Sequence, residues 1–215
     1  MKKSANGKAP LFSLKYLFYD FVKVTAVLPG LIWFRPKIIY VNENAKKRIR
    51  GGALVISNHL GFFDPLYLQF GIWYRRHHFI CLKEFFESRA SWLFKSFLCI
   101  PIDKHNFSIN SFREIIEHLD NGELVTMFPE GRVNGGSGEL NEFKSGMILM
   151  ALRSKKPIVP VYIYPKRKFY SRLKMVVGES VDVCTMYGNR PTFSQIDSMA
   201  ELLRQREDEL KSYIK

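Results

Sequence analysis

The sequence predicts an α/β domain in which a partly parallel sheet is flanked by helices, preceded by an amphipathic, membrane-associating helical segment. Short apolar runs alternate with longer stretches of helical pattern, which is the order that parallel βαβ units require. The length of 215 residues fits one domain with an appendage. With 47% hydrophobic and 25% charged residues, the chain has the composition of a globular protein rather than a disordered one. We divide it into residues 1–36 and 37–215.

The N-terminal segment Leu11–Phe34 is strongly apolar and aromatic. On a helical wheel of about 100° per residue, Lys15 and Asp20 fall on one side and a wide apolar face lies opposite. We expect the helix to break at Pro29-Gly30. Two interpretations stay open: the helix docks on the domain core, or it lies in a membrane interface with its Lys, Tyr and Trp side chains at headgroup level. Different parts of the face could do both.

The other elements follow from the same patterns. Strands are expected at short apolar runs, namely Ile38–Val41, Ala53–Ser57, His78–Leu82, Ile100–Ile102, Glu123–Phe128, Ile158–Tyr164 and Arg172–Val177. Helices are expected at Pro65–Tyr74, Ser88–Leu98, Ser108–Leu119, Lys144–Ser154 and Gln195–Lys211. Asp64 ahead of Pro65 is a typical start signal for the first of these helices.

The charge of the chain implies an acidic partner. Lys and Arg number 33 against 20 Asp and Glu, a net charge of +13. Nucleic acid, an anionic membrane surface, a phosphorylated substrate or an acidic carrier protein would fit. The basic clusters are Lys46–Arg50, Arg75–His78 and Lys166–Lys168. We expect no nucleic-acid partner, because no binding motif is visible and the aromatic residues gather in apolar runs rather than among these clusters.

Several features argue for action at the cytoplasmic side. The 3 cysteines form no CxxC pair, so neither a disulfide framework nor a zinc site is expected. His77, His78 and His105 show no metal-ligand spacing. No run reaches the roughly 20 uncharged residues that span a bilayer. Met1–Pro10 is basic, but charges interrupt the apolar stretch that follows, unlike a secretory signal.

The first candidate motif, Ser57–Asp64, joins a buried strand to a helix, where active sites of α/β proteins often lie. It holds His59 and, shortly after it, Asp64. A carboxylate that accepts the imidazole Nδ1–H would fix the tautomer and leave Nε2 as a base. Alternatively, Asp64 only caps the helix and His59 is an ordinary loop residue. The spacing alone does not decide between these interpretations.

The second candidate motif, Phe128–Arg132, follows another strand and so lies at an equivalent edge of the sheet. Gly131 between Glu130 and Arg132 would allow close backbone approach to an anionic ligand. A turn with a solvated ion pair would explain the same residues.

Together the two motifs are more specific. Asn-His-x4-Asp at Asn58–Asp64, followed by Phe-Pro-Glu-Gly at Phe128–Gly131, resembles the glycerolipid acyltransferase family, in particular its lysophosphatidate (1-acyl-glycerol-3-phosphate) acyltransferase branch. Lys83–Phe85, Ile102–Lys104 and Ile158–Val161 resemble weaker elements of that family. The resemblance covers more than half of the chain. A hydrophobic N-terminal membrane-binding segment is also usual in the family.

The resemblance implies transfer of a fatty acyl group from a thioester, acyl-CoA or acyl carrier protein, to the hydroxyl of 1-acyl-glycerol 3-phosphate, which makes phosphatidate for phospholipid synthesis. His59 would be the general base and Asp64 would orient it, without a covalent acyl-enzyme. The residues implied in substrate binding are Gly61, Phe62, Lys83, Lys104, Glu130, Gly131 and Arg132. No metal and no cofactor beyond the acyl donor are implied. The expected partners are an anionic membrane surface, the lysophospholipid acceptor and, as one of the two donors, acyl carrier protein.

Two departures concern the acceptor. Lys104 stands where the family usually has Arg, so bidentate phosphate binding is replaced by a point charge. Arg132 and Val133 stand where Thr and Arg are usual. Either Arg132 takes over phosphate binding or the acceptor differs. Glycerol 3-phosphate or another lysophospholipid therefore stays open as the acceptor, and a non-enzymatic basic module that binds membrane or nucleic acid is the alternative from another class.

Overall fold

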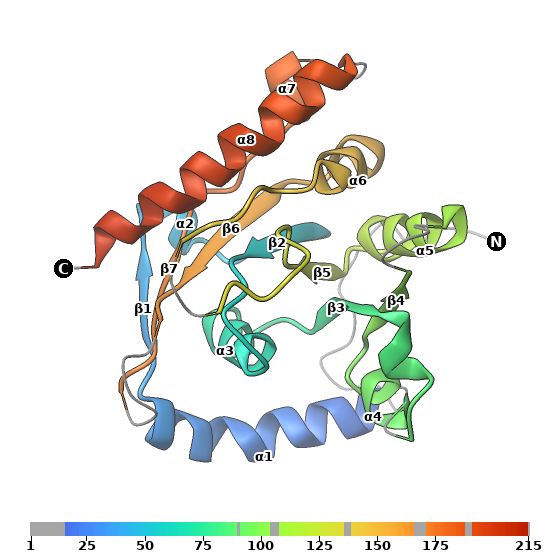
Figure 1. Cartoon of the computed structure of the whole chain (residues 1–215). Helices are drawn as coiled ribbons and strands as arrows, with labels where there is room; N and C mark the ends of the chain where they lie inside the picture. The colour runs from blue at the N-terminus through green and yellow to red at the C-terminus, as the bar shows by residue number, and fades with distance from the viewer. Residues whose placement is uncertain are drawn as a thin grey trace.

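The computed structural model describes residues 16–89, 91–103, 108–135, 139–165, 171–187 and 191–214. Its centre is a 7-stranded sheet with the order β1-β7-β6-β2-β5-β3-β4 (Figure 1). The strands are β1 (Lys37–Tyr40), β2 (Ala53–Ser57), β3 (His77–Leu82), β4 (Ile100–Ile102), β5 (Leu124–Met127), β6 (Ile158–Ile163) and β7 (Lys174–Val177). The helices are α1 (Leu17–Phe34), α2 (Glu43–Lys46), α3 (Asp64–Gly71), α4 (Ser91–Ser96), α5 (Ile109–Asp120), α6 (Gly146–Ser154), α7 (Cys184–Tyr187) and α8 (Phe193–Glu209), with 3-10 turns η2 (Lys83–Phe86) and η3 (Leu210–Tyr213).

The sheet is partly parallel, as predicted. The neighbours β6, β2, β5, β3 and β4 all run in one direction. β7 pairs antiparallel with β6, and β1 pairs parallel with β7, so this end of the sheet runs the other way. β2 lies among the parallel strands and is buried along its whole length. The carboxyl ends of β6, β2, β5 and β3 therefore meet at one edge of the sheet.

Alternate residues of β2 build two separate cores. Leu54 and Ile56 pack with side chains of α5, α6 and α8. Ala53 and Val55 face the other side, where they pack with α3 and with Phe34 at the end of α1. This period-two burial on both faces is typical of a strand inside a parallel sheet. Figure 1 shows α6 and α8 on one side of the sheet and α1 on the other.

Helix α1 differs from the prediction. It runs through Pro29 and Gly30 to Phe34, so the expected break is wrong. A Cβ on Gly30 would lie 2.2 Å from the ring of Phe70, and the glycine therefore lets the helix approach α3 closely. Phe34 packs edge-on against Tyr67 of α3 at a ring distance of 5.3 Å. This tertiary packing carries the helix past the proline, which removes only one helical hydrogen bond.

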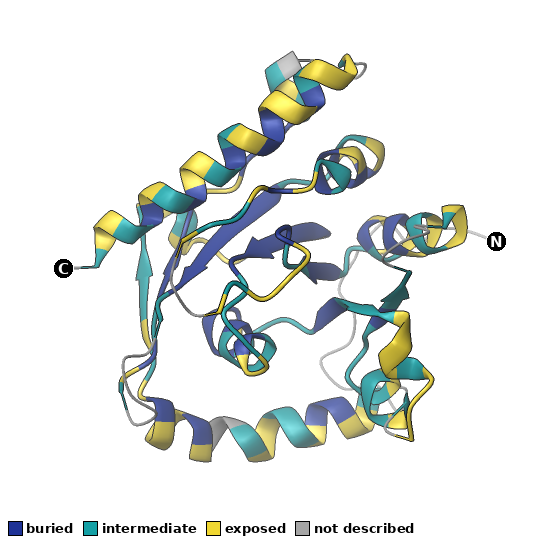
Figure 2. Ribbon diagram, in the orientation of Figure 1, coloured by how far each residue is buried: buried dark blue, intermediate teal, exposed yellow. Residues whose placement is uncertain are grey.

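One side of α1 docks on the domain. Tyr19 is buried, and Asp20 binds Arg76 through two hydrogen bonds of 2.6 and 2.8 Å. The other side exposes large apolar side chains (Figure 2), namely Leu17, Phe18, Phe21, Val24, Leu31, Ile32 and Trp33. No helix built from the described residues is long and apolar enough to cross a membrane.

The remaining predicted elements are present with shifted ends. The expected helix Ser88–Leu98 is present as the shorter α4, and the 3-10 turn η2 that precedes it was not predicted. The one-turn helices α2 and α7 were not predicted, because four residues are too few to show a helical period. Residues 1–15, Lys104 and the basic cluster Lys166–Lys168 lie outside the described residues.

Candidate active site

The site begins where β2 ends. Asn58 is fully buried, and its side chain makes two hydrogen bonds with the backbone of Ile163, the last residue of β6. Its Nδ2 donates to the Ile163 carbonyl at 2.9 Å, and its Oδ1 accepts from the Ile163 N–H at 2.8 Å. The Asn58 amide thus links the ends of two adjacent strands. This link fixes the direction in which the chain leaves β2 towards His59.

His59 and Asp64 form the predicted pair. The Nδ1 atom of His59 lies 2.8 Å from Oδ2 of Asp64. The same oxygen accepts the backbone N–H groups of Leu60 at 2.6 Å and Gly61 at 2.8 Å. The Asp64 side chain is 1% exposed, whereas that of His59 is 22% exposed. Three contacts to Oδ2 therefore hold the carboxylate in place. Because Nδ1 of His59 is occupied by Asp64, Nε2 is the ring nitrogen that can take a proton.

Asp64 does not cap α3. It is the first residue of that helix, and no side-chain cap hydrogen bond is made at the Phe63 position before it. Its carboxylate instead faces back onto the turn from His59 to Gly61. The alternative in which Asp64 only caps the helix is thus not what the structure has.

Glu130 of the second motif lies directly against the first. Its Oε1 accepts the backbone N–H of His59 at 2.9 Å. Its Oε2 accepts from both the backbone N–H of Asn141 at 3.0 Å and the Asn141 side chain at 2.5 Å. Glu130 is only 4% exposed. Its carboxylate therefore connects the turn after β2 with the loop before α6 and positions His59 through the backbone.

The imidazole of His59 is held from another side as well. It stacks on the ring of Phe128 with a centroid distance of 4.1 Å and an angle of 12°. The carbonyl of His59 accepts the N–H of Asn134 at 2.8 Å. Since ring and backbone are both fixed, little reorganisation is needed before a proton is transferred.

Two cations border the glycine of the second motif. Gly131 has a φ of +65°, and a Cβ there would lie 2.9 Å from Cε of Lys144. The backbone angle therefore favours glycine, and the contact shows that the end of the Lys144 side chain lies against this residue. The neighbouring Arg132 is exposed and donates to the side chain of Asn141 at 2.6 Å. The ammonium of Lys144 is therefore close to the exposed backbone of Gly131, and the exposed Arg132 follows directly in the chain.

The remaining predicted binding residues are less closely grouped. Gly61 donates to Asp64, whereas Phe62 on the same turn is 85% exposed. Lys83 begins η2, directly after β3, and lies 3.6 Å from Glu87. Because β3 ends two strands away from β2 at the same edge, Lys83 is about 10 Å along the sheet from the pair. Lys104 lies outside the described residues.

The sequence did not single out several residues that hold the site. Asn58 and Phe128 stand inside the two motifs, but their roles depend on β6 and on the imidazole. Asn134, Asn141 and Lys144 lie in a loop without periodicity, so no local signal marks them. Their contacts follow from the way that this loop returns to the end of β2.

A buried carboxyl group lies behind the site. Glu207 of α8 is 0% exposed, and among the described residues neither of its oxygens has a hydrogen-bond partner. Burial raises the pKa of Glu207 well above 4.5, and the nearby charge of Glu130 raises it further, while the backbone of Asn58 opposes this rise. Folding thus favours the neutral form of Glu207 over the charged form.

The sequence of this chain is similar to those of known proteins. Residues 37–164 match the family model described as Acyltransferase. A 1-acyl-sn-glycerol-3-phosphate acyltransferase of Bacillus subtilis is 29% identical over 181 residues, which are 81% of this chain and 87% of that protein. One of Streptococcus pneumoniae is 27% identical, over 67% of this chain and 53% of that protein.

A solved structure shows the same fold. The crystal structure of the 1-acyl-sn-glycerophosphate acyltransferase of Thermotoga maritima has a TM-score of 0.61 and 18% identity, covering 92% of this chain and 95% of that one. The family match spans β1 to the end of β6 and includes both motifs. The chain belongs to the acyltransferase family.

Proposed function

We propose that the protein transfers a fatty acyl group from a thioester, acyl-CoA or acyl carrier protein, to the hydroxyl of 1-acyl-glycerol 3-phosphate, and so makes phosphatidate. The observation that carries this proposal is the His59–Asp64 pair, with 2.8 Å between Nδ1 and Oδ2, at the end of the buried strand β2. Relatives named for this reaction support the choice of acceptor.

The geometry supports direct attack. The acceptor hydroxyl gives its proton to Nε2 of His59 while its oxygen attacks the thioester carbonyl. Asp64 stabilises the resulting imidazolium through Nδ1–H. When the tetrahedral intermediate collapses, the C–S bond breaks and the sulfur leaves as a thiol with the proton from Nε2. The N–H groups of Leu60 and Gly61 already bind Asp64, so other donors must stabilise the oxyanion.

A thiol-release assay tests this function. Palmitoyl-CoA and palmitoyl-acyl carrier protein are each combined with lysophosphatidate, glycerol 3-phosphate, lysophosphatidylethanolamine or no acceptor. We expect release that depends on the acceptor and is fastest with lysophosphatidate. A preference for another acceptor would correct the substrate. If a folded sample supplied with lipid releases no thiol with any donor–acceptor pair, the non-enzymatic binding module would be favoured.

Arg132 and Lys144 hold the acceptor phosphate, and the family resemblance adds Lys104. We expect Arg132→Gln and Lys144→Met each to raise the acceptor KM by about 10-fold with little change in kcat, because each loses about 1.4 kcal/mol of charge-assisted binding. Initial rates against acceptor concentration measure this effect. Arg153→Gln, at the far end of α6, removes the same charge as a control. An unchanged KM in both variants would exclude this assignment.

We further propose that α1 binds the protein to an anionic membrane surface, at the cytoplasmic face and without crossing it. The docked side of the helix is anchored by the Asp20–Arg76 pair, so its apolar side chains keep a fixed outward direction. Phe18 also packs edge-on against Trp92 of α4 at 5.9 Å, and Trp92 is itself 58% exposed. The apolar surface thus continues from α1 onto α4, which suits an interfacial helix.

Replacing Phe21 and Ile32 together by Glu is expected to lower binding to vesicles by more than 10-fold, because burial of each such side chain contributes about 1.5–3 kcal/mol. These residues are 64% and 78% exposed, so the fold should persist. Co-sedimentation with vesicles of phosphatidylglycerol and phosphatidylcholine measures the loss. The control replaces Ile109 and Phe193 by Glu, two large apolar residues on α5 and α8 that are 77% and 84% exposed. An equal loss in both double variants would show that α1 is not the contact.

A further inference from the structure

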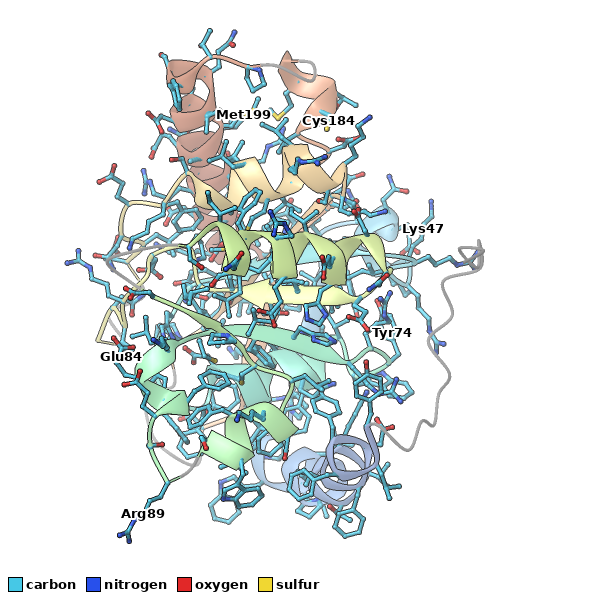
Figure 3. The ribbon with its side chains drawn as sticks, turned by 90° about the vertical axis from the view of Figure 1, so that its right-hand side faces the viewer. Lys47, Tyr74, Glu84, Arg89, Cys184 and Met199 are labelled. Carbon is cyan, nitrogen blue, oxygen red and sulfur yellow. The ribbon has the colours of Figure 1, made fainter. Side chains whose placement is uncertain are left out.

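A second group of titratable side chains lies at the opposite edge of the sheet. His78 is the second residue of β3, His118 is in the last turn of α5, and Glu123 directly precedes β5. Figure 3 labels Tyr74, just before β3, and Glu84, just after it, on opposite sides of the molecule. This group lies on the Tyr74 side, whereas the carboxyl ends of β2 and β3 lie on the Glu84 side.

The fold brings the group together from distant parts of the sequence. β3 and β5 are adjacent parallel strands, with His78 opposite Val125, so side chains at their amino ends are neighbours. Between α5 and β5 the chain turns at Gly122, which has a φ of +82°, and the N–H of Glu123 donates to the carbonyl of His118 at 3.0 Å. This tight turn brings the His118 ring back to the Glu123 carboxylate.

The three ligand atoms are close to metal-binding spacing. Oε2 of Glu123 lies 3.5 Å from Nε2 of His78 and contacts Nδ1 of His118, and all three atoms lie within 4.8 Å of one another. Zinc bonds of about 2.0–2.1 Å in a tetrahedral site place ligand atoms about 3.4 Å apart. The pair His78–Glu123 already has this spacing. A small rotation of the His118 side chain would bring its ring nitrogen to a similar distance from the other two ligand atoms.

We propose that His78, His118 and Glu123 bind a divalent transition-metal ion, zinc in the first instance, and thereby join β3, α5 and β5. Two imidazoles and a carboxylate are a donor set that zinc accepts. The His78 side chain is 5% exposed, while those of His118 and Glu123 are 24% and 19% exposed, so solvent can reach the fourth position. The site lies at the opposite edge of the sheet from His59, so a metal bound there would not take part in the chemistry at His59.

A further hydrogen bond holds the Glu123 carboxylate in place. The hydroxyl of Tyr16 donates to Oε1 of Glu123 at 3.3 Å, an outer contact of the kind that orients metal ligands. Because Tyr16 directly precedes α1, bound metal would also stabilise the start of that helix.

Zinc titration of the metal-free full chain against a chromophoric chelator tests the proposal. We expect uptake of one equivalent, and Co²⁺ in place of Zn²⁺ should give the visible absorption of a tetrahedral site. His118→Ala and Glu123→Gln each remove a ligand and should weaken binding by more than 100-fold. Tyr16→Phe removes only the outer hydrogen bond and should weaken it by about 10-fold.

His59→Ala is the matched control, because it removes the other described histidine–carboxylate pair and should leave zinc affinity unchanged. Zinc should raise the Tm of the wild type but not that of His118→Ala or Glu123→Gln, while circular dichroism of the metal-free variants checks their fold. If His118→Ala does not fold, the zinc affinity of Glu123→Gln is used instead, because glutamine keeps the shape of the side chain. A wild type that takes up no zinc, or equal uptake by both ligand variants, would show that the cluster is only a hydrogen-bond network.

Discussion

Replacing His59 by alanine is expected to lower kcat for acyl transfer by about 10³–10⁴-fold, at the upper end of what a general base contributes. The loss should fall on kcat rather than on donor binding, because the imidazole acts on the acceptor proton. The ring is 22% exposed and stacks on Phe128, so its removal should cost only modest stability. Thiol release under saturating donor and acceptor measures kcat, and a thermal melt checks the fold.

Asp64→Asn isolates the role of the carboxylate charge. Asparagine can still accept the N–H groups of Leu60 and Gly61, whereas alanine would leave both donors without a partner. We expect kcat to fall by about 10²–10³-fold, because the neutral amide stabilises the imidazolium of His59 less well. The double variant with His59→Ala should lose little more than His59→Ala alone, since the two residues act as a unit. Wild-type turnover in purified His59→Ala would contradict the mechanism.

The sequence predicts the elements of this fold better than their arrangement. The run Ala53–Ser57 is apolar up to its last residue and contains the β-branched Val55 and Ile56, and it forms the buried strand β2. Nothing in that run indicates that β2 lies between β5 and β6, because strand order depends on packing between distant segments. The break expected at Pro29-Gly30 was wrong for a related reason. Its local signal was correct, but contacts of Phe34 and Phe70 outweigh it.

The candidate site also contains residues that the sequence predicts and residues that it does not. His59, Asp64 and Glu130 could be recognised because their spacing follows two strand ends and matches a family pattern. Asn141, which binds Glu130 twice, could not, because its position is set by the path of a loop. Glu207 is an even clearer case. A glutamate in a charged C-terminal helix suggests an exposed residue, yet this one faces the sheet and is completely buried.

Replacing Glu207 by methionine is expected to stabilise the protein by about 1–3 kcal/mol near pH 8, because a buried polar group without a hydrogen bond costs about that much. Glu207→Gln should gain less, since the amide remains buried. Urea unfolding at pH 5 and pH 8 measures the free energy. Glu209→Met, an exposed position on the same helix, is the control and should change stability little at either pH.

The pH dependence distinguishes this explanation from simple repacking. The pKa of Glu207 is raised on folding, so above about pH 4.5 the unfolded chain releases a proton that the folded protein keeps. Wild-type stability therefore falls as pH rises from 4.5 towards the raised pKa, and the advantage of Glu207→Met should be larger at pH 8 than at pH 5. An advantage equal at both values would show that Glu207 does not titrate as inferred. Because Glu207 lies near Asn58 and Glu130, a stabilised variant with reduced kcat would indicate that the buried acid is retained for activity rather than stability.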